Sequence, residues 1–167
     1  YVRGQRISQD YKEAAKWFRR SSGQGHVHAQ YNLGQIYLQG KGVSRDYKKA
    51  IKWFRVSAGK GNVDAQNKLG WMYVKGQGVK ANNKEAIKWF SLSAEKGNVD
   101  AQNKLGWMYV KGQGVSLDYK KAIKWFRKSA EKGSVDAQNN LGVMYFNGKG
   151  LSQDYVRAYM FFNVAAE

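Results

Sequence analysis

The sequence contains no cysteine and no proline, and only 12 of its 167 residues are acidic. Without cysteine, neither a disulfide framework nor a thiol nucleophile is available, and the redox compartment stays open. Without proline, helices run without a forced break, so the chain must reverse direction at its 19 glycines. No apolar run approaches the roughly 18 residues that a membrane-spanning helix needs. The chain begins at Tyr1, halfway through a repeated unit, and we expect it to be a fragment of a longer protein.

The abundant residues are basic. Lysine and arginine number 29, which gives a formal net charge of +17. A surplus of this size favours acidic partners. Whether such a partner is a protein, a nucleic acid or an anionic surface depends on where the charge lies.

The strongest pattern is a period of 36 residues. It is marked by four tryptophans, Trp17, Trp53, Trp89 and Trp125, each followed by phenylalanine. The segment GNVDAQNKLGWMYVKGQGV occurs twice without change, at 61–79 and 97–115. A fixed period in this range indicates a stack of supersecondary units, each burying its apolar face against its neighbours. Because the four tryptophans recur in every unit, we interpret them as core residues.

Each unit contains two amphipathic patterns, which predict a helical hairpin. The first helix carries apolar residues at i, i+4, i+7 and i+8, as in Ala29, Leu33, Ile36 and Tyr37. The second carries Tyr47, Ala50, Ile51, Phe54 and Ala58 on one stripe. The first helices should start near His26, Asn62, Asn98 and Ser134, three of which are good N-caps. We therefore expect a leading second helix at about 8–22 and hairpins that start near 27, 63, 99 and 135.

Two further polar or small positions repeat inside the hairpins. Glycine stands within each first helix, at Gly34, Gly70, Gly106 and Gly142, although it costs about 1 kcal/mol there against alanine. This predicts a close approach of the hairpin partner, with Ala50, Ala86, Ala122 and Ala158 as the small residues that face it. Glutamine recurs at Gln30, Gln66, Gln102 and Gln138, which indicates a structural hydrogen bond.

The pattern AQxxLGxxY, GxGV, DYxxAxxWF, SAxxG, read from Ala101 to Gly133, resembles the Sel-one-like repeats, relatives of the tetratricopeptide repeat. The resemblance covers the whole chain. It implies an all-α, right-handed α-solenoid that acts as a scaffold or adaptor for other proteins, with a partial repeat at 1–25 and repeats at 26–61, 62–97, 98–133 and 134–167. Many such proteins are bacterial and exported, and cytoplasmic and eukaryotic members exist. Arg6 departs from the pattern, because it replaces the second glycine of the leading turn.

Positions that vary between units are candidates for partner contact. On the first helix they are Asn32, Gln35 and Gln39, then Lys68, Trp71 and Lys75, then Lys104, Trp107 and Lys111, then Asn140, Val143 and Asn147. Their spacing of three and four places them on one face, which lines the concave side in related solenoids. The leading hypothesis is a face that binds an acidic, partly apolar protein. The alternative for Trp71 and Trp107 is packing between repeats.

The second helices predict another surface. A basic ridge opposite their apolar stripes, on the convex side, is formed by Lys48, Lys52, Arg55, Lys84, Lys88, Lys120, Lys124 and Arg127. A solvated face explains it, and the alternative is nucleic-acid or anionic-surface binding through phosphate contacts. The last helix breaks the ridge with Val156, Met160 and Val164, which indicates that further structure covers this end or that it contacts a partner.

Catalytic or metal chemistry has little support. His26 and His28 lie two residues apart without neighbouring ligands, so we expect no metal and no cofactor. A catalytic constellation would break the repeat symmetry at one place, and the sequence shows no such break. An enzyme acting on cell-wall material is a third hypothesis that rests on fold-level association alone. We expect a non-catalytic protein.

Overall fold

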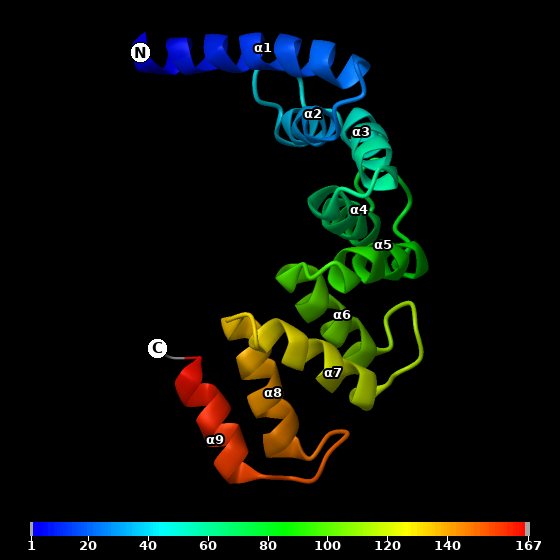
Figure 1. Cartoon of the computed structure of the whole chain (residues 1–167), viewed down its shortest axis with the longest axis vertical. Coiled ribbons are helices and arrows are strands. Elements are labelled where there is room, and N and C mark those ends of the chain that lie inside the picture. The colour runs from blue at the N-terminus through cyan, green and yellow to red at the C-terminus, as the bar shows by residue number, and fades with distance from the viewer. Residues whose placement is uncertain (1, 166–167) are drawn as a thin grey trace. The chain divides into compact units, whose positions relative to one another are not determined.

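The computed structural model describes the backbone of residues 2–165 and the side chains of residues 10–165. Within that range the chain forms nine helices and no strand (Figure 1). They are α1 (Val2–Gly23), α2 (Val27–Gln39), α3 (Tyr47–Gly59), α4 (Val63–Lys75), α5 (Asn83–Glu95), α6 (Val99–Lys111), α7 (Tyr119–Ala130), α8 (Val135–Asn147) and α9 (Tyr155–Val164). The predicted alternation of first and second helices is confirmed.

The chain divides into two compact units. The first, Tyr1–Asn82, contains α1 to α4, and the second, Asn83–Glu167, contains α5 to α9. Within each unit, every helix packs against the next one along the chain (Figure 1). Local packing of this kind is what a repeat array requires, because each element buries its apolar stripe on its sequence neighbours.

The first helices of the hairpins begin where the sequence places them, at Val27, Val63, Val99 and Val135. Asn62 caps α4 by accepting a hydrogen bond from the backbone N–H of Ala65 at 2.8 Å, and Ser134 caps α8 in the same way. His26 precedes α2 but makes no side-chain capping bond. At the other end of α4, Gly76 takes φ 66°, a left-handed conformation that glycine reaches without steric cost. These caps satisfy the backbone groups that a helix end leaves open.

The leading helix is longer than the sequence predicts. We expect it at about 8–22, whereas α1 runs from Val2 to Gly23. In the next repeat, Gly42 has φ 71° and helps to form the turn between α2 and α3. Arg6 stands at the equivalent position, and a side chain disfavours positive φ. The turn is therefore replaced by continued helix.

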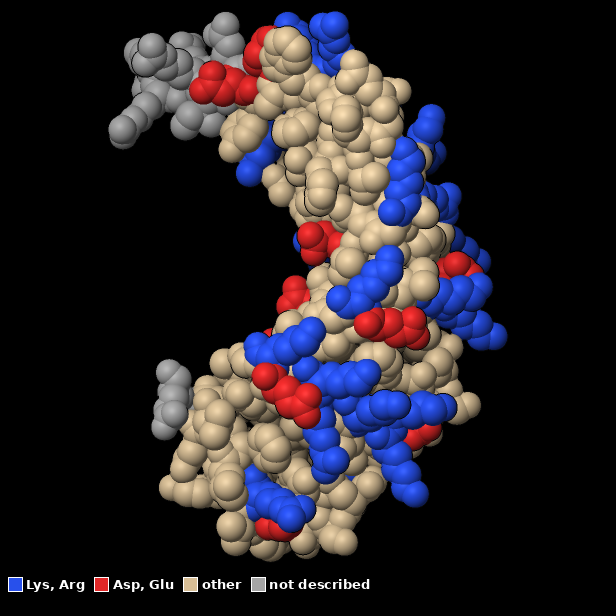
Figure 2. Space-filling model, in the orientation of Figure 1, with Lys and Arg blue, Asp and Glu red and all other residues tan. Residues whose placement is uncertain are grey.

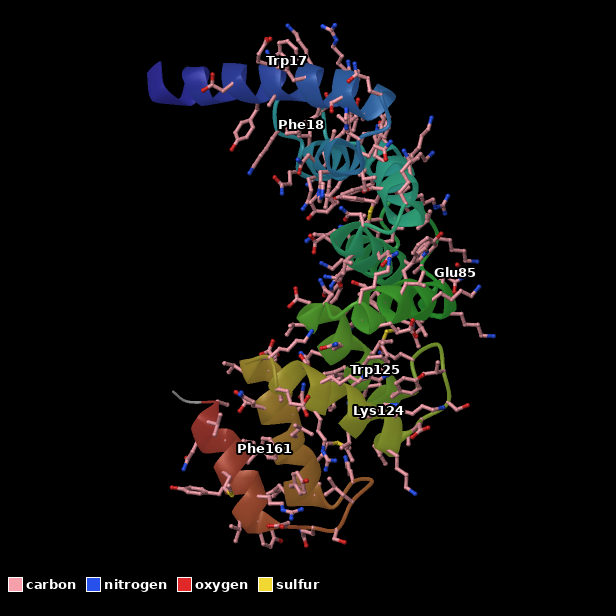
Figure 3. The ribbon with its side chains drawn as sticks, viewed as in Figure 1. Trp17, Phe18, Glu85, Lys124, Trp125 and Phe161 are labelled. Carbon is pink, nitrogen blue, oxygen red and sulfur yellow. The ribbon has the colours of Figure 1, made fainter. Side chains whose placement is uncertain are left out.

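The core includes a phenylalanine from each of the helices α3, α5 and α7. Phe54, Phe90 and Phe126 are fully buried. The prediction that the preceding tryptophans are core residues is wrong, because Trp17 is 60% exposed and Trp53, Trp89 and Trp125 are only half-buried. In Figure 3, Phe18 lies on the side of α1 that faces α2, and Trp17 lies on the other side.

Helix geometry explains the error. Consecutive residues point about 100° apart around a helix of 3.6 residues per turn. When the phenylalanine points into the core, the tryptophan before it therefore lies at the margin of the core. At that edge the indole of Trp125 is covered by the Lys128 ammonium, 4.9 Å from the ring centroid. Trp53, Trp89 and Trp125 therefore lie at the margin of the core and not inside it.

The glycines within the first helices mark a close approach of the hairpin partner, as predicted. A Cβ added to Gly34 would lie 2.7 Å from the ring of Phe54, and one added to Gly106 would lie 2.5 Å from the ring of Phe126. The predicted facing residue is wrong, since a bulky phenylalanine and not Ala50 occupies the space over Gly34. A large ring on one helix thus requires a missing side chain on the other.

The repeated glutamines form the predicted structural bonds. The side-chain amides of Gln30, Gln66 and Gln102 donate to the carbonyls of Ser22, Ala58 and Ala94 at 3.3, 3.1 and 3.0 Å. Each bond ties a first helix to the end of the second helix before it. For Gln102 and Ala94 this joins α6 to α5 within the second unit.

Candidate partner-binding surfaces

The helices α4 and α6 have the same sequence, VDAQNKLGWMYVK, and belong to different units. Their buried stripes include Leu69 and Met72 in α4, and Leu105 and Met108 in α6. Each helix also carries residues outside its own buried stripe, and we describe these two surfaces separately. The α4 patch consists of Lys68, Trp71 and Lys75, and the α6 patch consists of Lys104, Trp107 and Lys111.

The α4 patch borders a shallow groove in the first unit. The groove has a volume of about 240 Å³ and is lined by Lys68, Trp71, Met72, Lys75, Gln77 and, from α2, Leu38. The Lys75 ammonium lies 5.5 Å from the centroid of the Trp71 ring, a cation–π arrangement. Trp71 itself is half-buried. The groove therefore offers an apolar wall with positive charge at its edge.

The α6 patch is more open. Trp107 is 42% exposed, and the Lys111 ammonium lies 4.8 Å from its ring centroid. Lys104 is half-buried, on the turn before Trp107. The exposure of Trp107 means that this indole is a surface residue and not part of the buried core. The sequence left that choice open for both tryptophans.

The polar positions in the outer first helices are partly committed to internal bonds. Gln35 donates to the hydroxyl of Tyr31 at 2.7 Å, and Asn140 donates to the side-chain oxygen of Asn103 at 3.0 Å. Asn147 donates to the carbonyl of Val143, one turn earlier in α8. Asn32 is half-buried on α2. These four predicted contact residues are placed on the expected helices, but three of them already serve the fold.

The basic ridge is solvent-exposed along its whole length. All eight residues from Lys48 to Arg127 are exposed, and Figure 2 shows lysine and arginine gathered over the second helices. Figure 3 marks Lys124 on α7 as a member. Lys88 pairs with Glu85 on the same helix, also marked there. Exposed pairs of this kind contribute little stability.

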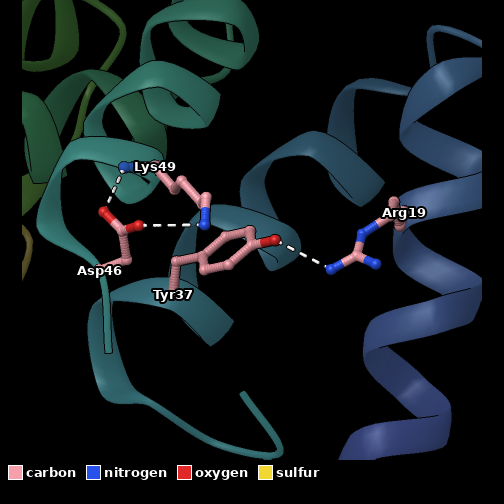
Figure 4. A network of polar contacts seen from close by, with 4 residues as sticks. All are labelled: Arg19, Tyr37, Asp46 and Lys49. Carbon is pink, nitrogen blue, oxygen red and sulfur yellow. Dashed lines mark hydrogen bonds and ion pairs between the residues drawn. The ribbon is translucent and has the colours of Figure 1, made fainter. Parts of the chain in front are cut away.

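The arginines have a structural role that sequence reasoning missed. Arg19 donates to the hydroxyl of Tyr37 at 3.0 Å (Figure 4), and Arg127 donates to the hydroxyl of Tyr145 at 3.1 Å. Arg55 donates to Tyr73 in the same way. Each bond links a second helix to the first helix of the next repeat. The signal was available, because each arginine precedes its tyrosine by 18 residues.

The three apolar residues of the last helix lie on its surface. Val156, Met160 and Val164, which we call the α9 stripe, are 73%, 60% and 53% exposed. The prediction that they occupy exposed positions is confirmed.

Side chains that suit catalysis or metal binding are not brought together. Among the described residues, no group of three or more histidine, aspartate or glutamate side chains is placed to hold a metal ion.

The Asp46 carboxylate caps α3. The backbone N–H of Lys49 donates to it at 2.9 Å and holds the pKa of that carboxyl below its usual value. Figure 4 shows that this carboxylate also pairs with the Lys49 ammonium.

In the described part of the chain, no helix is both long enough and apolar enough to span a membrane.

Comparison with known proteins identifies the repeat. The Sel1 repeat model matches residues 1–26, 27–62, 63–98, 99–134 and 135–167. Among solved structures, a protective antigen present in uropathogenic Escherichia coli strains, which displays an SLR fold, is 37% identical over 99% of this chain with a TM-score of 0.92. A Sel1 repeat protein from Oxalobacter formigenes is 34% identical over 93% of the chain with a TM-score of 0.89. No curated protein matches the chain.

The chain covers only part of the length of these two solved proteins. The chain spans 37% of the Escherichia coli antigen and 64% of the Oxalobacter protein. Helicobacter pylori cysteine rich protein B is 24% identical over 78% of this chain and 94% of its own, with a TM-score of 0.62, and shares the fold. Together the likenesses confirm the predicted all-α repeat solenoid class.

Proposed function

This chain belongs to the Sel1 repeat family, and from that premise we propose that the α4 patch and the α6 patch are docking points for an acidic, partly apolar protein partner. Sel1 repeat proteins are generally protein-interaction modules, and their fold is typically a non-catalytic scaffold. The proposal concerns which surface is used and what it selects. That this face is the concave one stays a prediction from the family resemblance.

The observation that carries the proposal is the exposed indole held beside a lysine. Trp107 is 42% exposed while the Lys111 ammonium lies over its ring. An indole left in water supplies a large apolar area when a partner covers it, and tryptophan is among the residues most enriched at binding hot spots. The lysine beside it keeps an unmatched positive charge at the edge of that area. A partner with a carboxylate next to an apolar side chain complements both.

The net charge supports the same choice of partner. A chain of +17 attracts acidic surfaces over a distance of about 8 Å at physiological salt, whereas the apolar contact acts only once the surfaces meet. Lysines therefore affect mainly the association rate, and the tryptophans affect mainly the lifetime of the complex. The groove beside Trp71 offers the partner an apolar contact in the first unit, in addition to Trp107 in the second unit.

Substitution of the two tryptophans tests the proposal. Trp71→Ala and Trp107→Ala should each weaken a complex by about 2 kcal/mol, roughly 30-fold, while the circular dichroism spectrum stays native. The measurement is a pull-down from lysate and envelope fractions at about 150 mM salt, followed by titration of the recovered protein against each variant. Trp17→Ala is the matched control, because Trp17 is 60% exposed but lies outside both patches.

Other results would point elsewhere. Equal recovery by the native chain and by the Trp71→Ala/Trp107→Ala variant would contradict the proposal. Recovery of nucleic acid with steep salt dependence and no sensitivity to either tryptophan would transfer the function to the basic ridge, the second hypothesis.

A further inference from the structure

The last helix differs from every earlier second helix at two surface positions. In α1, α3, α5 and α7 both positions are lysine, namely Lys12, Lys16, Lys48, Lys52, Lys84, Lys88, Lys120 and Lys124. In α9 they are Val156 and Met160, which are 73% and 60% exposed. The region of α9 in Figure 2 accordingly carries few charged side chains. A monomeric protein seldom keeps a row of apolar side chains in water without a use for it.

The α9 stripe leads into a groove. A hollow of about 520 Å³ lies among α7, α8 and α9, with an apolar lining that includes Ala130, Leu141, Met160, Phe161 and Val164. Phe161, labelled in Figure 3, stacks on Tyr145 with ring centroids 5.7 Å apart. In α7 the equivalent positions hold Trp125 and the Lys128 that covers it. In the last repeat Phe161 and Val164 stand at these positions, and both line the hollow.

Two guanidinium groups stand at the groove. Arg127 bonds to the hydroxyl of Tyr145 at 3.1 Å, and the Arg157 guanidinium lies 5.7 Å from the centroid of the same ring. Both residues line the groove, together with the carboxylate of Glu131, and Arg157 already pairs with Asp154 at 3.4 Å. The exposed lysines of α7 extend the positive charge beyond it. An occupant with acidic groups near Arg127 and the exposed lysines of α7 therefore matches the charge of this site.

We propose that the α9 stripe and its groove dock an amphipathic helix of a protein partner, with apolar residues at i and i+4 and an acidic residue directed to Arg127. The stripe itself runs at i, i+4 and i+8, a length of about 12 Å at 1.5 Å per residue, which suits a helix laid along it. A second copy of the chain is a poor occupant, because each copy carries a net charge of +17. The site shares no residue with the α4 and α6 patches.

The test uses the full chain and a synthetic helical peptide of about 16 residues, with leucines at i and i+4 and glutamates on both flanks. Methyl NMR of the protein should show a shift of the Met160 methyl on addition of peptide. Val156→Lys/Met160→Lys should weaken binding at least tenfold. Because this variant restores the lysines of α7, we expect it to fold, and its added positive charge would otherwise strengthen attraction to the acidic peptide. Val143→Lys is the control, since Val143 is an exposed valine outside the groove.

Three outcomes would overturn the proposal. One is an unchanged Met160 methyl at about 1 mM peptide, where even a weak site of this kind is occupied. Another is equal binding of a peptide whose glutamates are replaced by lysines. The third is a Met160 methyl that shifts with protein concentration alone, which would make a second copy the occupant. Trp71→Ala/Trp107→Ala should leave peptide binding unchanged, so this site and the proposed function fail independently.

Discussion

Replacement of Gly34 by alanine should destabilise the protein, although the same change in most helices does the opposite. An alanine within a helix is favoured over glycine by about 1 kcal/mol, so the intrinsic effect of the change is stabilising. In this structure the new Cβ would lie 2.7 Å from one atom of the Phe54 ring and 2.8 Å from another. Optimal carbon–carbon contact is about 3.5–4.0 Å, so the overlap is roughly 1 Å.

The ring has little freedom to move away. Phe54 is fully buried, and overpacking of a dense core costs about 1–3 kcal/mol. Subtracting the gain in helix propensity, about 1 kcal/mol, leaves a net loss of about 0–2 kcal/mol for Gly34→Ala. Gly59 provides the matched control in the same unit, because a Cβ there would meet nothing within 4 Å. Gly59→Ala should therefore stabilise the protein by up to about 1 kcal/mol.

Chemical denaturation followed by circular dichroism measures both changes. The decisive result is the difference in stability between the two variants, which does not depend on the absolute stability of the chain. Gly34→Ala combined with Phe54→Leu should be less unstable than the two single changes predict, because the smaller side chain removes the overlap. If Gly34→Ala stabilises the chain as much as Gly59→Ala does, the close contact between α2 and α3 is refuted.

Two further predictions concern the links between helices and their caps. Ser91 stands where α1, α3 and α7 carry the arginine that bonds to the next repeat, so Ser91→Arg should add a bond to Tyr109 and stabilise the protein by about 0.5–1.5 kcal/mol. A gain that persists in a Tyr109→Phe background would contradict this. Asp46 and Asp118 have pKa values below their usual 3.8, first because the backbone N–H three residues on donates to each carboxylate. A lowered folded-state pKa gives stability that is present above the unfolded-state pKa and is lost as pH falls through the folded-state value. Thermal melts of Asp46→Asn/Asp118→Asn should therefore depend less on pH below about 4 than those of the native chain, and parallel curves would exclude the effect.

Sequence reasoning was most successful where a structure depends on residues close together in the chain. The cap at Asn62 follows from backbone N–H groups at the helix start that must be satisfied within a few residues. The glutamine bonds were also predicted, because Gln66 reaches a carbonyl only eight residues away. Repetition made these signals easy to recognise, since each local rule recurs at intervals of 36 residues.

It failed where several aromatic residues competed for one place. The spacing marked Trp53 and Phe54 equally, and we predicted both as core residues, yet only the phenylalanine is fully buried. The choice depends on the gap that Gly34 leaves on the facing helix, 20 residues earlier in the chain. For the same reason the predicted partner of that gap, Ala50, was wrong.

The candidate sites show the same division. The sequence alone determined the repeat and the net charge of +17, which follow from the order and kinds of residues. It also determined the helices and the helix faces on which Trp71, Trp107 and the α9 stripe lie, because these follow from the 3.6-residue period. Tertiary structure decided how far each side chain is covered. Trp71 and Trp107 occupy identical helices, yet Trp107 is 42% exposed and Trp71 lines a groove with Leu38. The groove beside α9 likewise exists only where three helices meet, since the burial of a side chain depends on atoms supplied by distant segments and not on its own neighbours in sequence.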